Sequence, residues 1–239
     1  MKKYVLIPAA LAMLAGPAFA QEYTLQPAAP VTGEQPVADP VMDQVSLLQS
    51  AWAQIKYQMP DKDAQLAAIH QLEDRAANLT ATYPTRAEPK IWEGIILSTD
   101  AGIVKGISAL GKVKKAKSLF EASIQQDPQA MEGSAYTSLG SLYYQVPGWP
   151  VAFGDKDAAA ANLKQALQIN PNGIDPNFFY GDFLLQTNHP DQAQIYLEKA
   201  LLAPDRPGRE LADAGRRQEI RAALAQIRQK KKDSDTINH

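Results

Sequence analysis

The chain has 239 residues and no cysteine, and its 24 basic residues nearly balance 26 acidic ones. Without cysteine it can form neither disulfides nor thiolate metal sites, so an apolar core must hold the fold together. The net charge of −2 provides no basic surface for nucleic acid or anionic lipid, and we expect neither as a partner.

Residues 1–20 predict a cleaved export signal. Lys2 and Lys3 precede an apolar run, and Ala18 and Ala20 occupy the two positions that a signal peptidase reads. A membrane anchor is the weaker interpretation, because the run is shorter than the roughly 20 apolar residues that cross a bilayer. We therefore expect cleavage after Ala20 and a periplasmic protein without a membrane span. Secretion into the medium is the alternative destination.

The remaining chain divides into three parts. Residues 21–40 are rich in proline and lack an apolar period, which predicts a disordered linker. Residues 41–229 carry helical periodicity throughout, with no sustained alternation that would indicate a sheet. Residues 230–239 form a polar tail that we expect to fray.

The first two helix pairs are the less regular ones. In the first pair, the two helices are residues 45–59 and 72–83. Both carry apolar side chains at intervals of three and four, and Pro60 and Pro84 follow them. The next pair has Trp92 in its first helix, and its second helix runs from Ala116 to a stop at Pro128. Between these two helices, residues 100–112 form an expansion that contains three glycines.

Two clearer units follow, and they repeat one pattern. Each has a first helix with a central glycine and a second helix with a small–large–small stripe before a proline. The glycine lets the paired helices approach closely. The first unit carries Tyr136, Leu139, Gly140, Tyr143, Ala159, Leu163, Ala166, Leu167 and Pro171; the second carries Asn177, Tyr180, Gly181, Leu184, Ala193, Leu197, Ala200, Leu201 and Pro204.

This pattern resembles the tetratricopeptide repeat, a helix–turn–helix unit of about 34 residues. The resemblance covers about three quarters of the chain and is most specific in residues 134–171 and 175–204. The preceding unit is degenerate, with Ile95 and Ile96 where leucine and glycine are expected. The resemblance implies an all-α fold, namely an α-solenoid of antiparallel helix pairs.

An insertion interrupts the first clear unit. Gly140 and Gly154 are fourteen positions apart, where the repeat leaves about seven. The insertion contains two prolines and two large apolar side chains, Trp149 and Phe153. These side chains either fold back over the ends of neighbouring helices or form a binding loop.

Residues 210–229 predict a C-terminal helix that caps the stack, because a solenoid must cover its last apolar face. Leu211, Ile220, Leu224 and Ile227 are expected to face the stack. The arginines of this helix are expected to form a solvated face: Arg216, Arg217, Arg221 and Arg228.

No residues with catalytic spacing are found. The three histidines, His70, His189 and His239, are far apart, and no phosphate loop, nucleophile elbow or HExxH motif is present. We therefore expect no enzyme activity, no metal and no cofactor.

The resemblance implies a concave groove lined by the first helix of each pair. It places ten residues there: Ser134, Thr137, Ser141, Tyr144, Gln145, Asp175, Phe178, Asp182, Leu185 and Gln186. With the inserted loop, the candidate site for a partner comprises Ser141, Tyr144, Trp149, Phe153, Phe178 and Asp182. The aromatic members could equally pack against neighbouring helices.

Two functions fit this sequence. The first is an exported scaffold that binds a protein or peptide in the periplasm. The second follows from a weaker resemblance to the T component of TRAP-type solute transporters, which is also an exported helical-repeat protein. It implies an accessory protein that binds a small ligand or the transporter's substrate-binding protein.

Overall fold

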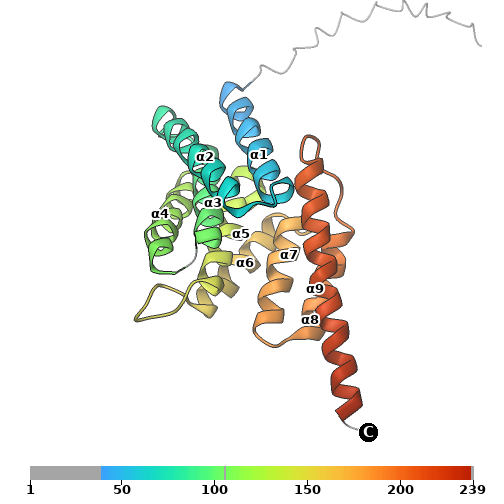
Figure 1. The fold of residues 1–239 in the computed structure, drawn as a ribbon. Coiled ribbons are helices and arrows are strands. Elements are labelled where there is room, and N and C mark those ends of the chain that lie inside the picture. Colours follow the sequence, from blue (N-terminus) through green and yellow to red (C-terminus); the bar gives the residue numbers. More distant parts are fainter. Residues whose placement is uncertain (1–38, 105, 238–239) are drawn as a thin grey trace, which may run out of the picture. The chain divides into compact units, whose positions relative to one another are not determined.

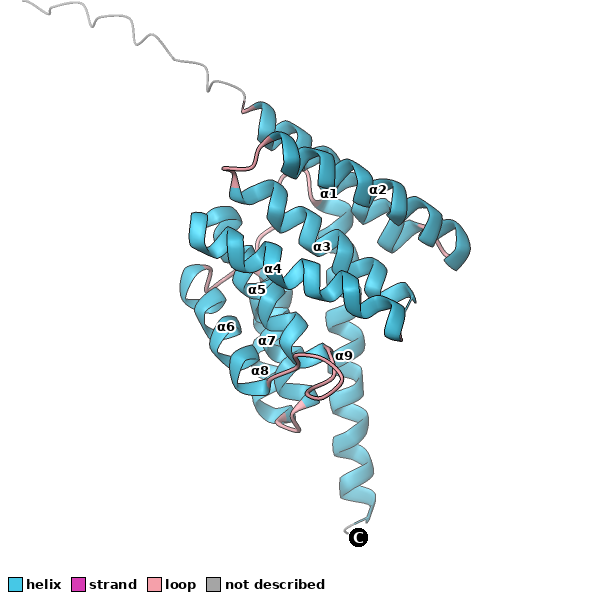
Figure 2. Ribbon diagram, turned by 90° about the vertical axis from the view of Figure 1, so that its left-hand side faces the viewer, coloured by secondary structure: helices cyan, strands magenta, loops and turns pink. Residues whose placement is uncertain are grey.

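The computed structural model describes residues 39–104 and 106–237. The predicted export signal and all but the last two residues of the predicted linker lie outside this part. Every regular element within it is helical (Figures 1 and 2). The elements are α1 (Pro40–Gln58), α2 (Lys62–Thr82), α3 (Ala87–Val104), a short 3-10 helix (Ile107–Ala109), α4 (Leu110–Gln126), α5 (Ala130–Gln145), α6 (Lys156–Ile169), α7 (Ile174–Gln186), α8 (Pro190–Leu201) and α9 (Glu210–Ile237).

Local signals in the sequence account for the helix ends. Asp39, Asp61 and Asp155 precede α1, α2 and α6, and each side chain accepts a hydrogen bond from a backbone N–H of the first turn. Such caps satisfy N–H groups that have no partner within the helix. Pro60, Pro128, Pro171 and Pro204 follow the ends of α1, α4, α6 and α8, as expected of a residue that cannot continue a helix.

Consecutive helices pack as pairs: α1 with α2, α3 with α4, α5 with α6, and α7 with α8. A β-carbon built on Gly140 would lie 2.7 Å from Leu163 Cγ, and one on Gly181 would lie 2.8 Å from Leu197 Cγ. These are the close approaches that the repeat pattern predicts. The predicted solenoid of antiparallel helix pairs is confirmed.

The degenerate unit makes the same contact, but through a different residue than the sequence suggested. A β-carbon on Gly94 would lie 2.5 Å from Cε1 of the buried Phe120. Gly94 therefore corresponds to Gly140 and Gly181 of the other units. The alignment that placed Ile96 at the glycine position was wrong by two residues. The expansion after it is mostly helical, because α3 continues to Val104.

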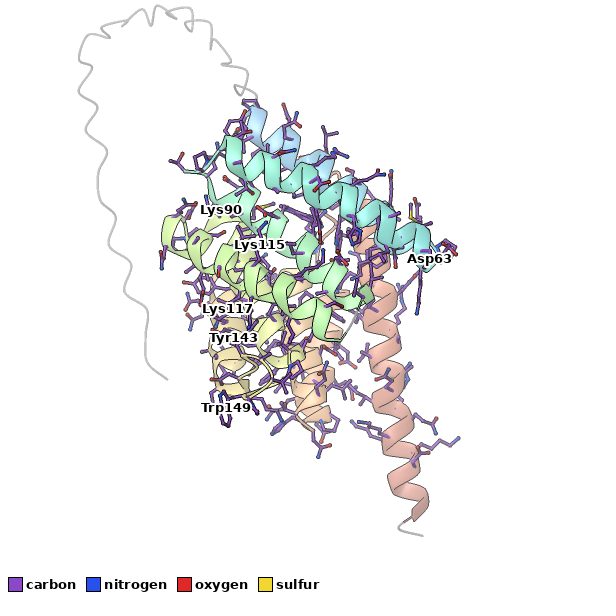
Figure 3. The ribbon with its side chains drawn as sticks, turned by 60° about the vertical axis from the view of Figure 1, so that its left-hand side comes forward. Asp63, Lys90, Lys115, Lys117, Tyr143 and Trp149 are labelled. Atoms are coloured by element: carbon purple, nitrogen blue, oxygen red, sulfur yellow. The ribbon has the colours of Figure 1, made fainter. Side chains whose placement is uncertain are left out.

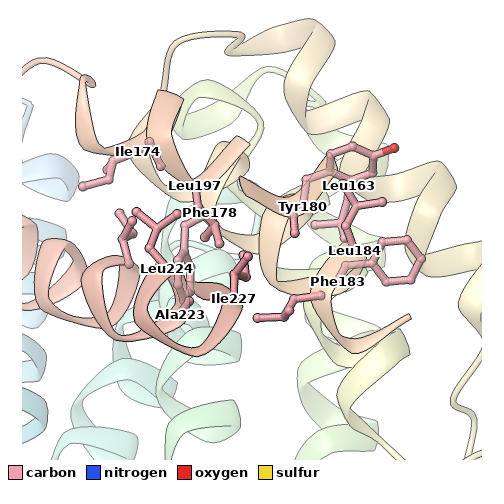
Figure 4. Close-up of a cluster of buried hydrophobic side chains, with 14 of the residues drawn as sticks. Leu163, Ile174, Phe178, Tyr180, Phe183, Leu184, Leu197, Ala223, Leu224 and Ile227 are labelled. Atoms are coloured by element: carbon pink, nitrogen blue, oxygen red, sulfur yellow. The ribbon is translucent and has the colours of Figure 1, made fainter. Parts of the chain in front are cut away.

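Helix α9 caps the stack, as predicted. Figure 4 shows Ala223, Leu224 and Ile227 of α9 packed against Phe178 of α7. The helix continues to Ile237, so the predicted end at Gln229 was wrong.

The same helix also reaches the first helix of the stack. Ala212 belongs to the apolar cluster of α1, and a β-carbon on Gly215 would collide with the ring of Tyr57. Helix α9 therefore lies beside α1, α7 and α8 (Figure 1). In the described part of the chain, none of the helices is both long and apolar enough to cross a membrane.

Candidate functional site

A cavity of about 1300 Å³ lies between the first helices of the pairs and the C-terminal cap. Helices α1, α3, α5 and α7 contribute one face each, and α9 with the segment before it contributes the opposite side. Lining residues recur every three or four positions, because only one face of each helix points inward. On α5 they are Met131, Glu132, Ser134, Thr137, Ser138, Ser141, Leu142 and Gln145, and on α7 they are Asp175, Phe178, Phe179 and Asp182.

An ion-pair network crosses the cavity between α7 and α9. Arg216 is only 6% exposed, and its Nε donates to Asp175 Oδ1 at 2.8 Å. Arg206 Nη1 donates to the other oxygen of Asp175 at 2.8 Å. Burial alone would raise the pKa of Asp175, but the two arginines outweigh it and hold the pKa below its ordinary value. The prediction that Arg216 is solvated was therefore wrong.

Aromatic rings surround the same arginine. The Arg216 guanidinium carbon lies 4.4 Å from the ring centre of Phe178 and 4.6 Å from that of Phe179. A planar guanidinium stacks well on aromatic faces while its edge keeps its hydrogen bonds. The cavity wall is thus both apolar and charged at this point.

The α1 end of the cavity is built from aromatic residues and one lysine. The ring centres of Trp52 and Trp92 are 5.7 Å apart in an edge-to-face arrangement. Lys56 Nζ lies 5.2 Å from the Trp52 ring centre and 2.9 Å from Glu219 Oε1. Burial and, to a lesser degree, repulsion by Arg216 lower the pKa of Lys56 to about 8.

Three of the six predicted site residues line this cavity: Ser141, Phe178 and Asp182. Tyr144 does not line it. Its ring packs on Phe183, with ring centres 5.6 Å apart, and its hydroxyl donates to Asp182 Oδ2 at 2.6 Å. Burial, followed by the Asp182 charge, raises the pKa of the Tyr144 hydroxyl. Tyr144 therefore links α5 to α7 and orients the carboxylate of Asp182, which lines the cavity, without lining the cavity itself.

The inserted loop separates its two large side chains. Phe153 folds back on Tyr143, with ring centres 5.8 Å apart, whereas Trp149 is 89% exposed (Figure 3). Neither residue lines the cavity, although Pro147 and Val151 of the same loop do. The folding-back interpretation thus holds for Phe153 and fails for Trp149.

Backbone hydrogen bonds give this loop a defined conformation. Gly154 N donates to Pro147 O at 2.9 Å, and Asp155 N donates to Tyr143 O at 2.9 Å. A β-carbon on Gly154 would lie 2.0 Å from Val146 O, so the loop closes on a position that only glycine can occupy. Trp149 therefore projects from an ordered support.

Sequence reasoning missed the basic and aromatic residues of the cavity, chiefly Lys56, Trp92 and Arg209. Arg209 precedes α9, and its guanidinium carbon lies 5.1 Å from the ring centre of Trp92. No sequence spacing brings these two residues together. Among the described residues, no group of three or more histidine, aspartate or glutamate side chains could hold a metal ion.

Comparison with known proteins supports the fold. Residues 151–208 match the family model for the tetratricopeptide repeat. No curated protein matches the chain. A thermophilic tetratricopeptide-repeat protein of Thermus thermophilus is 20% identical, with a TM-score of 0.51 over 78% of this chain and 80% of that one. This likeness confirms the predicted tetratricopeptide-repeat fold.

Two other solved structures show a weaker likeness. Yeast Tom70 is 13% identical, with a TM-score of 0.42 over 78% of this chain and 41% of its own. The PilF protein of Pseudomonas aeruginosa is 14% identical, with a TM-score of 0.33 over 77% of this chain and 90% of its own.

Proposed function

We propose that this protein is an exported scaffold that binds a segment of another protein in the cavity between its first helices and α9. The observation that carries the proposal is the size of the cavity, about 1300 Å³. Pockets for small molecules usually enclose about 300–1000 Å³, so this space suits a peptide segment. Its walls combine aromatic rings with arginines, the residue types that dominate binding energy at protein interfaces.

A single cysteine tests the position of the site, because the natural chain has none. Ser138 lies in the cavity, and Ser118 is exposed on α4 outside it. Ser138→Cys and Ser118→Cys, each coupled to a benzophenone maleimide, would be irradiated in envelope extract and their adducts identified by mass spectrometry. We expect a specific adduct from Ser138→Cys that Ser118→Cys lacks. Equal adducts from both would reject the cavity as the binding site.

Export is supported by the sequence of residues 1–20, which ends in Ala18-Phe19-Ala20. If the proposal is correct, the protein recovered from the periplasmic fraction begins at Gln21. A chain that retains Met1 and stays in the cytoplasm would reject the export and, with it, any periplasmic partner.

A second candidate is the accessory protein of a TRAP-type transporter. The observation that favours it is the packing of α9 against both α1 and α7, which closes one side of the cavity. Such closure suits a ligand small enough to be surrounded. A TRAP transporter operon beside the gene would favour this function, and its absence would favour the general scaffold.

A further inference from the structure

Two acidic residues of α7 line the cavity, and they differ in their partners. Asp175 and Asp182 are seven positions apart, so they lie on the same face of the helix. Asp175 bonds Arg206 and Arg216 of the C-terminal segment, whereas Asp182 forms no ion pair with a described residue. One face of α7 therefore presents a neutralised carboxylate and an uncompensated one.

Neutral donors hold the Asp182 carboxylate in place but occupy only one of its oxygens. Tyr144 Oη donates to Oδ2 at 2.6 Å, and Gln186 Nε2 donates to the same oxygen at 2.9 Å. Oδ1 accepts no hydrogen bond from a described residue, and it is not enclosed by protein. Burial raises the pKa of Asp182, although the bonds from Tyr144 and Gln186 oppose the shift, as expected of a carboxylate that lacks a counter-charge.

The side chains near Asp182 add acceptors and no free cation. Gln145 Nε2 donates to Ser141 Oγ at 3.0 Å and to Tyr144 Oη at 3.2 Å, while Gln145 Oε1 bonds no described residue. Arg216 attracts Asp182 only from a longer range, because its own bonds go to Asp175 and Glu219. The uncompensated carboxylate is thus already oriented toward a donor that the chain itself does not supply.

The charge of the whole lining has the same sign. Five acids face four bases: Glu88, Glu132, Asp175, Asp182 and Glu219 against Lys56, Arg206, Arg209 and Arg216. Pairs with residues outside the lining offset each other, since Arg86 bonds Glu88 and Asp213 bonds Arg206. A cation entering the cavity therefore meets a small excess of negative charge.

We propose that Asp182 binds the lysine or arginine side chain of a protein segment held in the cavity. The inference rests on the proposed function and specifies what that site recognises. Arg216 illustrates the fit, because it bonds the other carboxylate of this face while its guanidinium lies against the rings of Phe178 and Phe179. A basic side chain suits such a place, since its methylene stem lies along an apolar wall while its charged end meets a carboxylate.

Peptide libraries test this preference without knowledge of the natural partner. The probes are acetylated and amidated peptides with random uncharged flanks and a fixed central lysine, arginine, norleucine or glutamate. Norleucine matches the lysine stem without its charge. Peptides retained by the purified protein would be quantified by mass spectrometry. We expect the lysine or arginine library to be retained about ten-fold more strongly than the norleucine library, because a charged hydrogen bond is gained.

Matched variants locate the preference. Asp182→Asn keeps an acceptor for Tyr144 but removes the charge, so the advantage of the basic libraries over norleucine should disappear. Asp182→Glu, which keeps the charge, should retain part of that advantage. Asp74→Asn removes an exposed acid of α2 outside the cavity and should leave the advantage unchanged. Thermal melts of the variants establish that they are folded.

Equal retention of the basic, norleucine and glutamate libraries, or retention of none of them, overturns the cation anchor. A basic preference that survives Asp182→Asn overturns the assignment to Asp182. Spermidine serves as a free amine in the same assay, and binding of spermidine without any retained peptide overturns a protein side chain as the source of the cation.

The crosslinking experiment fails independently of this one. If the Ser138→Cys adduct forms while no basic preference is found, the protein site stands and only the anchor falls. If the preference depends on Asp182 while no adduct forms in envelope extract, the anchor stands and the envelope partner falls.

Discussion

Replacing Gly94 with alanine should not stabilise the protein and should cost up to about 2 kcal/mol, although alanine is the better helix former. A β-carbon at this position would lie 2.5 Å from Cε1 and 2.7 Å from Cζ of Phe120. Phe120 is completely buried, so its ring cannot swing into solvent to make room. The same helix offers a control, because a β-carbon on Gly102 would meet nothing within 4 Å.

The expected magnitudes follow from two opposing effects. Alanine in place of glycine stabilises a helix interior by about 0.8–1 kcal/mol, which applies to Gly94, and by less in the last turn, where Gly102 lies. Overpacking a buried contact costs about 1–3 kcal/mol, and only Gly94 has such a contact. Gly102→Ala should therefore stabilise the fold by up to about 1 kcal/mol, while Gly94→Ala should range from neutral to about 2 kcal/mol destabilised. For a domain of this size, each kcal/mol shifts the melting temperature by roughly 2–4 °C.

Thermal and urea unfolding, followed by far-ultraviolet circular dichroism, would measure the difference. Phe120→Leu introduces the residue type that Leu163 and Leu197 provide in the other units, so it should cost less in the Gly94→Ala background than in the natural chain. If Gly94→Ala and Gly102→Ala melt at the same temperature, the close approach at Gly94 is refuted, and the register of this unit with it.

Three further predictions concern the site. At pH 8 about half of Lys56 should be neutral against less than ~1% of an ordinary lysine, so its amine should be labelled faster than that of an ordinary lysine, at a rate that rises with pH to a midpoint near 8; ordinary reactivity would contradict the lowered pKa. Trp149→Ala should change the free energy of unfolding by less than about 0.5 kcal/mol, whereas Phe153→Ala should lower it by about 1–3 kcal/mol; a reversed order in thermal melts would contradict the loop geometry. Arg216→Ala should cost about 2 kcal/mol or more in urea unfolding, because it removes a buried guanidinium that bonds Asp175 and Glu219, while Arg221→Ala should be neutral; equal effects would argue against the network.

The repeat could be predicted because it rests on local contacts of fixed spacing. Gly140 and Gly181 each follow a residue of the apolar face and precede an alanine-rich helix, so sequence alone identified the pairs. Gly94 escaped because Glu93, not leucine, precedes it, and Ile96 appeared to take its place. The contact requires a residue without a side chain where α3 meets Phe120. A motif defined by residues that are neighbours in the sequence does not identify such a position.

The cavity was predictable only where it follows the helix period. Ser141, Phe178 and Asp182 lie inside because the groove face of each first helix recurs regularly. One missed signal was available, since Arg216 lies one helical turn before the buried Ile220 and so shares its face. The meeting of Trp92 with Arg209 depends on α9 returning to the start of the stack, and no local pattern records such a contact.

The basic residues that line the cavity come mostly from a different part of the chain than the helices that form its walls. Three of the four basic residues that line it, Arg206, Arg209 and Arg216, come from the end of the chain, whereas Lys56 alone comes from the repeats. The repeat helices supply apolar and hydroxyl-bearing walls together with acidic residues such as Asp175 and Asp182, and the packing within each helix pair depends on the glycine contacts. Substitution of Arg209, which forms no ion pair with a described residue, can therefore change the charge of the cavity while leaving the helix pairs intact, whereas substitution of Arg216 would also break the ion pairs between α7 and α9. The converse also holds, because a residue such as Gly94 supports the walls without touching what they enclose.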